Sequence, residues 1–305
     1  MVIMTVTVLV PDDDGMEFLG ELPGIRPVRY EAGAPLPPEA AEAEVLIPRS
    51  HRAAEELFAQ LPNLKLVQLL SAGAEDWVDD VPAGMLLSTC RGAHGGSTAE
   101  WVVAVLLSIY RELVGFAADQ QAGLWNRRTT DTLQDKRVLV VGAGDLGGHV
   151  KRRLEAFEAR VTLVGLTARE GVHAVEELPA LLPESDAVVL VVPLTSRTRG
   201  MVDRDFLAAM PDNAVLVNAA RGRVVDTDAL VAELTAGRLR AALDVTDPEP
   251  IPPEHPLWTA PGLVLTPHVA GSVRGVRRRS YAVAATQIEQ YAGGELPDNL
   301  VHGEY

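Results

Sequence analysis

Cysteine and positive charge are both scarce in this chain. Cys90 is the single cysteine, which excludes an intramolecular disulfide and a metal site built from several cysteines, so we expect a small buried residue and no bound metal. Lysine and arginine number 27, against 42 aspartate and glutamate residues, and the formal net charge is −15. This balance disfavours binding to nucleic acid or to an anionic membrane surface, because both would repel the chain.

Long apolar runs are also missing. None approaches the roughly 20 residues that cross a membrane as a helix. The opening stretch, MVIMTVTVLVP, lacks the basic start of a signal peptide and alternates threonine with valine, which is typical of a strand. We therefore expect a cytoplasmic protein. With 305 residues, of which 47% are hydrophobic, the chain is long enough for two globular domains.

Short runs rich in valine and leucine recur, with helical stretches between them. In the first third these runs are 5–10, 44–48, 65–70 and 85–89, with a helix expected over 53–61. Further along they are 137–142, 160–165, 186–193, 213–220, 239–245 and 263–267, with helices expected over 202–210 and 227–234. Strands that alternate with helices predict parallel sheets covered by helices on both faces.

The stretch from Ser97 to Gly123 predicts one long apolar helix. It begins with a sequence similar to a capping box, in which Ser97 is the N-cap and Glu100 follows three residues later. No proline interrupts it, and no glycine occurs before Gly115. Such a helix is well suited to bridging two domains, and a last helix is expected over 272–291.

A glycine-rich loop follows one of the predicted strands. In RVLVVGAGDLGG, Gly142, Gly144 and Gly147 fit the pattern GxGxxG between an apolar strand and an amphipathic helix. The first glycine permits a tight turn, the second lets the backbone approach a pyrophosphate, and the third lets the helix pack on the strand. N–H groups of Asp145, Leu146 and Gly147 would then point at the anion. The sequence therefore predicts a dinucleotide site.

The end of the next strand bears on which dinucleotide binds. For NAD, an acidic residue about 20 residues after the glycines normally binds the ribose hydroxyls. Here VTLVGL is followed by Thr167, Ala168 and Arg169, with no carboxylate before Glu170. Thr167 and Arg169 are suited to a 2′-phosphate, which a carboxylate would repel. We therefore predict NADP as the preferred cofactor and NAD as the alternative.

Three further strand ends carry residues suited to catalysis. Arg221 follows the strand in NAARG, Asp244 ends ALDV with Glu249 in the loop beyond, and His268 follows LVLTP. Ligands of open α/β sheets bind beyond the carboxyl ends of the strands. We therefore expect Arg221, Glu249 and His268 to converge near the nucleotide.

Several segments occur together in one order along the chain. They are VGAGDLG, PLTSRTRG (193–200), NAARGRVVD (218–226), ALDVTDPEP (242–250) and PLWTAPGLVLTPHVAGS (256–272). Together they closely resemble the D-isomer-specific 2-hydroxyacid dehydrogenase family, and the resemblance covers most of residues 92–301. In the first 90 residues, SAGAEDWVD (71–79) resembles the substrate loop of that family.

The resemblance implies a fold of two α/β domains, each with a Rossmann- or flavodoxin-like parallel sheet, and an active site in the cleft between them. The substrate domain would be discontinuous, formed by 1–96 plus 274–305. The dinucleotide-binding domain, 97–273, would be inserted into it, with the helix from Ser97 and the last helix as the two crossovers. Trp125 lies where the family forms its dimer contact, so we expect a homodimer.

The resemblance also implies an activity, the interconversion of a 2-oxoacid and a D-2-hydroxyacid with NAD(P). Arg221 would bind the substrate carboxylate and polarise the carbonyl, for which its bidentate fork is suited. His268 would be the general acid in reduction and the base in oxidation, because an imidazole titrates near neutral pH. Glu249 would orient the imidazole and favour its protonated form.

Further residues are assigned by resemblance to binding roles. The cofactor contacts would include Thr98, Pro193, Ala219 and Asp244. The substrate carboxylate would be held by backbone N–H groups of Ser71, Ala72 and Gly73. Arg49, in IPRSHR, either reaches the cleft from the first domain or is solvated, and we favour solvation. His94 is interpreted as structural, and the basic run 273–280 as a solvated helix face.

Two alternative functions involve the same part of the sequence. Formate dehydrogenases of this family carry glutamine where Glu249 stands, so a Glu–His pair favours hydroxyacid chemistry. A dinucleotide-sensing interaction protein, like the corepressors built on this scaffold, would keep Arg221, Glu249 and His268. The acidic net charge weighs against that reading.

Overall fold

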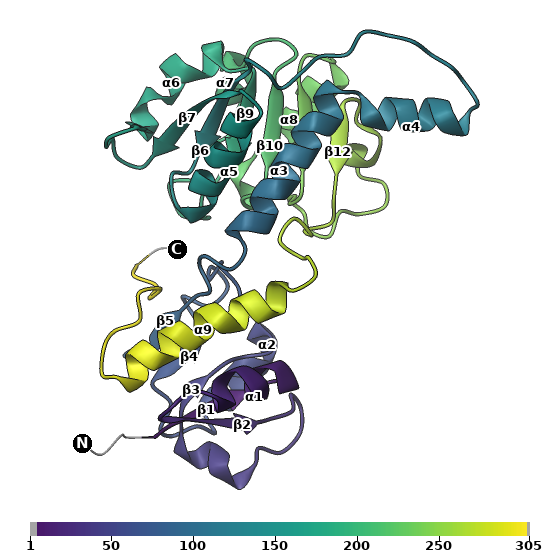
Figure 1. The fold of residues 1–305 in the computed structure, drawn as a ribbon. Coiled ribbons are helices and arrows are strands. Elements are labelled where there is room, and N and C mark those ends of the chain that lie inside the picture. The colour runs from purple at the N-terminus through teal and green to yellow at the C-terminus, as the bar shows by residue number, and fades with distance from the viewer. Residues whose placement is uncertain (1–4, 304–305) are drawn as a thin grey trace. The chain divides into compact units, whose positions relative to one another are not determined.

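The computed structural model describes residues 5–303, apart from the side chains of residues 52–55. Two compact units make up the chain (Figure 1). Unit 1 joins Met1–His94 to Arg274–Tyr305, and unit 2 is Gly95–Val273. Each unit holds a parallel sheet with helices packed on it, which confirms the predicted α/β class.

Unit 1 is built on strands in the order β2-β1-β3-β4-β5, which is the order of flavodoxin-like folds. Its elements are β1 (Val6–Val10), α1 (Asp13–Gly20), β2 (Ile25–Arg29), β3 (Ala43–Leu46), α2 (His51–Phe58), β4 (Leu66–Gln68), β5 (Leu86–Ser88) and α9 (Val276–Ala292). Successive strand residues face opposite sides of a sheet. Val8 of β1 accordingly packs with α1 and α9, and Leu9 packs with α2.

Strand β2 is missing from the elements that the sequence predicts. Pro27 interrupts its apolar run, and proline cannot donate a backbone hydrogen bond to a sheet. The sheet order explains why the strand forms nevertheless, because β2 lies at the edge, next to β1 alone. An edge strand needs hydrogen bonds on one side only, so the proline is tolerated there.

Unit 2 is built on strands in the order β12-β11-β10-β9-β6-β7-β8, the doubly wound order of Rossmann folds. Its strands are β6 (Arg137–Val141), β7 (Arg160–Gly165), β8 (Val172–Ala174), β9 (Ala187–Leu190), β10 (Val215–Asn218), β11 (Arg240–Leu243) and β12 (Leu263–Leu265). Its helices include α3 (Gly95–Tyr110), α4 (Leu113–Gln121), α5 (Asp145–Ala156), α6 (Leu178–Leu181), α7 (Arg204–Ala209) and α8 (Thr227–Thr235).

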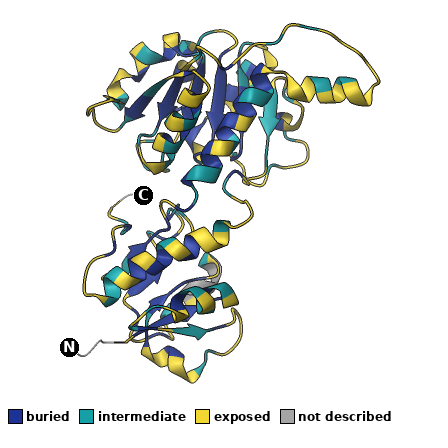
Figure 2. Cartoon of the chain, viewed as in Figure 1, coloured by how far each residue is buried: buried dark blue, intermediate teal, exposed yellow. Residues whose placement is uncertain are grey.

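The sheet of unit 2 is covered on both faces, and its central strands are buried (Figure 2). Val138 and Val140 of β6 face α3 and α5, whereas Leu139 and Val141 face α7 and α8. The same alternation runs through β9 and β10. Strands with two buried faces read as continuous apolar runs, which is why these elements are predictable from the sequence.

The prediction of one helix over 97–123 is wrong. Two helices, α3 and α4, bend by 62° at a break between them. Glu112 lies in the break with a left-handed backbone, φ 51°, which ends the helical path. Burial explains the position of the break: Tyr110 is 1% exposed, and α4 beyond it buries no residue. The first helix also begins at Gly95 rather than at the predicted cap, Ser97.

Among residues 5–303, no single helix is long and apolar enough to cross a membrane, although the bent pair α3 and α4 reaches that length and composition together. Cys90 is buried, as expected, and its thiol contacts the carbonyl of Ser280 at 3.1 Å. Burial raises the pKa of Cys90 to about 12, so the residue stays a protonated thiol. It is a packing residue rather than a nucleophile.

Candidate active site

The carboxyl edge of the unit 2 sheet brings the predicted site residues together. The strands are parallel, so all of their carboxyl ends meet at this edge. Across the sheet, the edge carries His268 after β12, Asp244 after β11, Arg221 after β10, Pro193 after β9, Gly142 after β6 and Arg169 after β7. From β6 the chain continues to its neighbour on one side, β7, whereas from β9 it continues to its neighbour on the other side, β10. The boundary between β6 and β9 is therefore the topological switch point of the sheet.

The glycine loop has backbone geometry that other residues cannot adopt. Gly142 has φ +120°, and a Cβ atom there would lie 2.4 Å from the carbonyl oxygen of Val191. A Cβ on Gly147 would lie 1.9 Å from the carbonyl oxygen of Gly142. Both glycines are therefore required by the close packing of β6, α5 and β9. They fix the turn from strand to helix.

Gly144 differs from those two glycines, because a Cβ there would meet nothing within 4 Å. This open space lies at the N-cap of α5, where the backbone N–H groups of Asp145, Leu146 and Gly147 have no partner one turn earlier in the helix. The side chain of Asp145 lies against Gly95 of α3. The loop therefore fits a pyrophosphate, which would approach the backbone at Gly144.

Arg169 lies beside the glycine loop. Its guanidinium donates to the carbonyl oxygen of Ala143 at 2.7 Å, and its backbone pairs with Val172. Thr167 is exposed on the same turn. A cation thus stands at the adenosine end of the expected cofactor path, where an NAD-specific protein would carry an acidic residue.

His268 and Glu249 form a close pair at the opposite end of the edge. Nδ1 of His268 lies 2.7 Å from Oε1 of Glu249, and about half of each side chain is exposed. His268 has a left-handed backbone, φ 55°, which is uncommon for a residue other than glycine. Its N–H donates to the carbonyl oxygen of Asp244 at 2.7 Å.

Asp244 has a structural role that sequence reasoning missed. Its side chain is buried, and Oδ1 accepts hydrogen bonds from the Thr266 hydroxyl at 2.6 Å and the Val269 N–H at 2.8 Å. Oδ2 accepts from the Ala270 N–H at 2.9 Å. One carboxylate therefore holds the chain on both sides of His268 in its unusual conformation. No local pattern in the sequence signals this role, because the partners of the carboxylate lie 22 to 26 residues further along the chain.

Arg221 is held by the turn that follows β10. Asn218, which is buried, accepts from the Ala220 N–H at 3.0 Å and donates to the Arg221 carbonyl at 3.0 Å. The Arg221 guanidinium donates to the carbonyl oxygen of Ala220 at 2.7 Å. A Cβ on Gly222 would lie 1.9 Å from the carbonyl oxygen of Thr246, so this turn packs tightly on the loop after β11. Asn218 is a further positioning residue that the motif alone did not suggest.

The remaining predicted residues fall in both units. Thr98 is buried in the first turns of α3, and Ala219 follows β10. In unit 1, the loop containing Ser71, Ala72 and Gly73 follows β4. The Ser71 hydroxyl donates to the Gly73 carbonyl at 2.8 Å, and the backbone carbonyl of Ser71 accepts from the Cys90 N–H at 2.8 Å. The imidazole of His94 contacts the Leu70 carbonyl at 3.0 Å and so supports the start of this loop.

Proteins commonly bind NAD or NADP at the carboxyl edge of a doubly wound sheet, and a His–Glu pair at that edge is suited to transferring a proton. The class of protein defined this far is a dinucleotide-dependent oxidoreductase. Residues 103–270, which lie within unit 2, match the family model described as D-isomer specific 2-hydroxyacid dehydrogenase, NAD binding domain. The chain belongs to the D-isomer specific 2-hydroxyacid dehydrogenase family, and it is an oxidoreductase.

Individual relatives agree with this assignment. A glyoxylate reductase from Thermofilum pendens is 33% identical over 264 residues, which are 82% of this chain and 78% of that protein. A D-isomer specific 2-hydroxyacid dehydrogenase from Xanthobacter autotrophicus, solved with NADPH and MES, is 30% identical with a TM-score of 0.85 over 98% of both chains. An NADPH-dependent glyoxylate/hydroxypyruvate reductase from Sinorhizobium meliloti, solved with NADP and sulfate, is 26% identical with a TM-score of 0.83 over 98% of both chains.

Proposed function

We propose that this protein reduces 2-oxoacids to D-2-hydroxyacids with NADPH, and that it also catalyses the reverse reaction. The observation that carries the proposal is the 2.7 Å contact between His268 and Glu249 at the carboxyl edge that also bears the glycine loop. The family and the reductase from Thermofilum pendens support the reaction class. The domain roles follow from this: 97–273 binds the dinucleotide, and 1–96 plus 274–305 binds the substrate.

The catalytic roles are assigned to three residues. When bound, the reduced nicotinamide supplies a hydride to the carbonyl carbon. His268 gives the proton to the carbonyl oxygen from Nε2, because Nδ1 is engaged by Glu249. Glu249 holds the imidazole in place through its contact with Nδ1. Arg221 binds the substrate carboxylate and polarises the carbonyl through its planar guanidinium.

The remaining motif residues are assigned to cofactor and substrate binding. Gly142, Gly144, Asp145, Leu146 and Gly147 would hold the pyrophosphate. Further cofactor contacts would come from Thr98, Thr167, Arg169, Pro193, Ala219 and Asp244. Ser71, Ala72 and Gly73 of unit 1 would bind the substrate carboxylate through their backbone N–H groups.

A panel of 2-oxoacids tests the proposed function. Purified protein is assayed with glyoxylate, hydroxypyruvate, phenylpyruvate and branched-chain 2-oxoacids, each with NADPH and with NADH. We expect turnover of at least one acid, with D-stereochemistry in the product. A protein that binds NADPH tightly and reduces none of them would instead support the dinucleotide-sensing alternative, which keeps the same three residues.

The cofactor preference for NADPH rests on Arg169. Its guanidinium lies against the glycine loop, and no carboxylate precedes Glu170 after β7. The relatives from Xanthobacter autotrophicus and Sinorhizobium meliloti were solved with NADPH and NADP, respectively. These observations support NADP as the cofactor of this chain too, with NAD as the weaker ligand.

Replacement of Arg169 by alanine is expected to raise KM for NADPH by roughly 10- to 100-fold, because a charge-assisted contact with the 2′-phosphate is lost. KM for NADH should change little, because NADH has no 2′-phosphate. An unchanged KM for NADH would also show that the glycine loop is intact. Arg160→Ala is the matched control, since Arg160 is an exposed arginine at the other end of β7. A wild-type protein that prefers NADH, or a variant with equal losses for both cofactors, would contradict the assignment.

A homodimer is proposed from the surface around α4. This helix buries none of its residues, and it exposes Leu113 and Val114. Leu124 follows it, and the adjacent Trp125 is 92% exposed. Apolar side chains gathered in this way favour association with a second copy. In sedimentation velocity, Trp125→Ser should shift a dimer toward monomer, whereas Trp258→Ser, at an exposed tryptophan elsewhere in unit 2, should not.

A further inference from the structure

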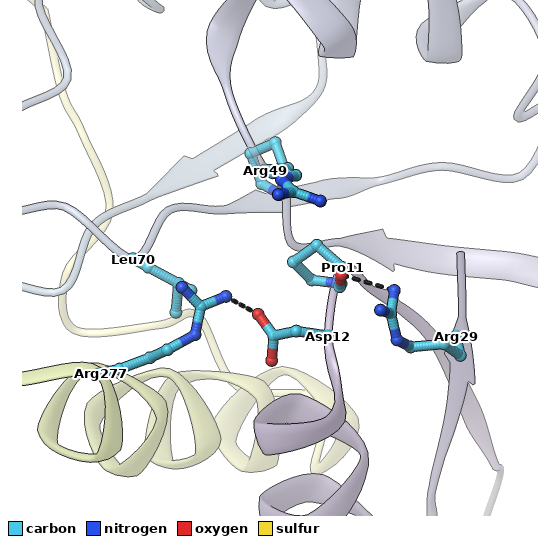
Figure 3. Close-up of a pocket in the computed structure, with 7 residues that line it drawn as sticks. Pro11, Asp12, Arg29, Arg49, Leu70 and Arg277 are labelled. Atoms are coloured by element: carbon cyan, nitrogen blue, oxygen red, sulfur yellow. Dashed lines mark hydrogen bonds and ion pairs between the residues drawn. The ribbon is translucent and has the colours of Figure 1, made fainter. Parts of the chain in front are cut away.

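A pocket of about 550 Å³ opens at the carboxyl edge of the unit 1 sheet (Figure 3). Its walls come from the ends of four strands and from the first turn of α9. The lining residues are Pro11 and Asp12 after β1, Arg29 at the end of β2, Pro48 and Arg49 after β3, Leu70 after β4, and Arg277 in α9. None of these residues has a role in the function proposed above.

Two of the three arginines are neutralised by neighbouring groups. Arg277 pairs with Asp12, as Figure 3 shows, and its Nε lies 3.4 Å from Asp14. Arg29 donates to the Pro11 carbonyl at 2.5 Å, as Figure 3 also shows. It pairs with Asp13 at 3.3 Å. The Asp12 carboxylate also accepts hydrogen bonds from the Gly15 N–H, which caps α1, and from the Tyr281 hydroxyl, both at 2.9 Å. These contacts build a firm pocket wall with little net charge.

Arg49 is different. Its guanidinium makes no ion pair with any side chain that the structure describes, although it is exposed in a chain of net charge −15. Its backbone is held firmly, because the Tyr30 hydroxyl accepts from the Arg49 N–H and donates to the Ile47 carbonyl, both at 3.1 Å. A guanidinium on a fixed turn keeps its five donors available to a planar anion.

The apolar part of the lining indicates the shape of the ligand. Pro11 and Pro48 are buried beside the charged groups, and Leu70 completes the wall. Such a surface suits a short carbon stem that ends in an anionic group. Leu70 also precedes Ser71 directly, so the pocket adjoins the loop to which the proposed function assigns the substrate carboxylate.

We propose that this pocket receives a second anionic group of the substrate, with Arg49 as the residue that selects it. The substrate is then a 2-oxoacid with a distal carboxylate, since glyoxylate has no side chain to place in such a pocket. This inference rests on the proposed function and narrows its substrate class. The pocket is suited to an anionic group, which could come from the substrate or from a free ion such as inorganic phosphate. The test below distinguishes these two sources.

The test compares two isosteric substrates. 2-Oxoglutarate ends in a carboxylate, and 5-methyl-2-oxohexanoate ends in an isopropyl group of similar size without charge. We expect the wild-type protein to prefer 2-oxoglutarate in kcat/KM. Arg49→Ala should lower the ratio of the two kcat/KM values by roughly 10- to 100-fold, which is the size of a charge-assisted contact, and mostly through KM. Arg49→Lys keeps the positive charge but loses the planar guanidinium, so its ratio should lie between those of the wild-type protein and Arg49→Ala.

Arg26→Ala is the matched control, because Arg26 is an exposed arginine of β2 that pairs with Glu42 outside the pocket. It should leave the ratio unchanged. A wild-type preference for the uncharged acid, or an unchanged ratio in Arg49→Ala, overturns the inference. The inference is also overturned if inorganic phosphate inhibits the reduction of both substrates equally and this inhibition is lost in Arg49→Ala. The pocket would then bind a free anion.

Two outcomes separate this inference from the proposed function. Turnover of glyoxylate or hydroxypyruvate without turnover of 2-oxoglutarate leaves the function standing and refutes the distal carboxylate. If no 2-oxoacid is reduced, the proposed function fails, and calorimetric titration with glutarate then tests the pocket alone. Weaker glutarate binding by Arg49→Ala supports an anion site in the pocket, whereas equal affinity or no binding to either protein refutes it.

Discussion

Replacement of His268 by asparagine should lower kcat for 2-oxoacid reduction by roughly 10²- to 10⁴-fold, which is the usual contribution of a general acid. Asparagine is chosen because His268 has φ 55°, and asparagine adopts the left-handed region more readily than most residues. The fold around the site should therefore survive. Cofactor affinity, measured by fluorescence titration with NADPH, should stay close to that of the wild-type protein.

The chain contains a matched control for this substitution. His173 and Glu177 form a second pair in which Nδ1 and Oε2 are also 2.7 Å apart, and both side chains are about half exposed. This pair lies at β8, at the other edge strand of the sheet from β12. His173→Asn should leave kcat unchanged. Near-normal turnover by His268→Asn, or equal losses in both variants, would remove His268 from the mechanism.

The second large effect is expected at Gly147. An alanine there would place its Cβ 1.9 Å from the Gly142 carbonyl oxygen, so α5 would have to move away from β6. Backbone shifts of this kind cost about 1–3 kcal/mol or more. The free energy of unfolding, measured by urea denaturation followed by circular dichroism, should fall by at least about 1 kcal/mol. The helix displacement should also impair NADPH binding.

Two neighbouring glycines serve as controls for that result. Gly148 lies in the same helix, but a Cβ there meets nothing within 4 Å, so Gly148→Ala should stabilise the protein by about 0.5–1 kcal/mol. Gly144→Ala should leave stability nearly unchanged, because its surroundings are also open. It should nevertheless weaken NADPH binding, since the methyl group would occupy the space through which a pyrophosphate approaches. Tight NADPH binding by Gly144→Ala would refute the pyrophosphate assignment.

The sequence predicts the core of unit 2 and its sheet edge well, for a physical reason. Strands buried on both faces appear as unbroken apolar runs, and the residues after them necessarily meet at one edge. The positions of Arg221, Glu249 and His268 in the fold follow from that rule. Their roles remain proposals, because the rule places residues but does not assign chemistry to them.

Features that depend on contacts distant in sequence could not be predicted. The break at Glu112 reflects the end of burial at Tyr110, which no local pattern records. The pocket of unit 1 combines Arg49 with Arg277, which lie more than 200 residues apart in the chain. The role of Asp244 likewise emerges only when β11 and β12 lie side by side.

The buried state of Cys90 has a practical consequence. Because it is the single native thiol and its pKa is raised to about 12, reagents that require a thiolate will not modify it in the folded protein at neutral pH. A cysteine introduced anywhere on the surface would then be the sole reactive position. Fluorophores or spin labels can therefore be attached one site at a time to the native sequence, without first building a cysteine-free background.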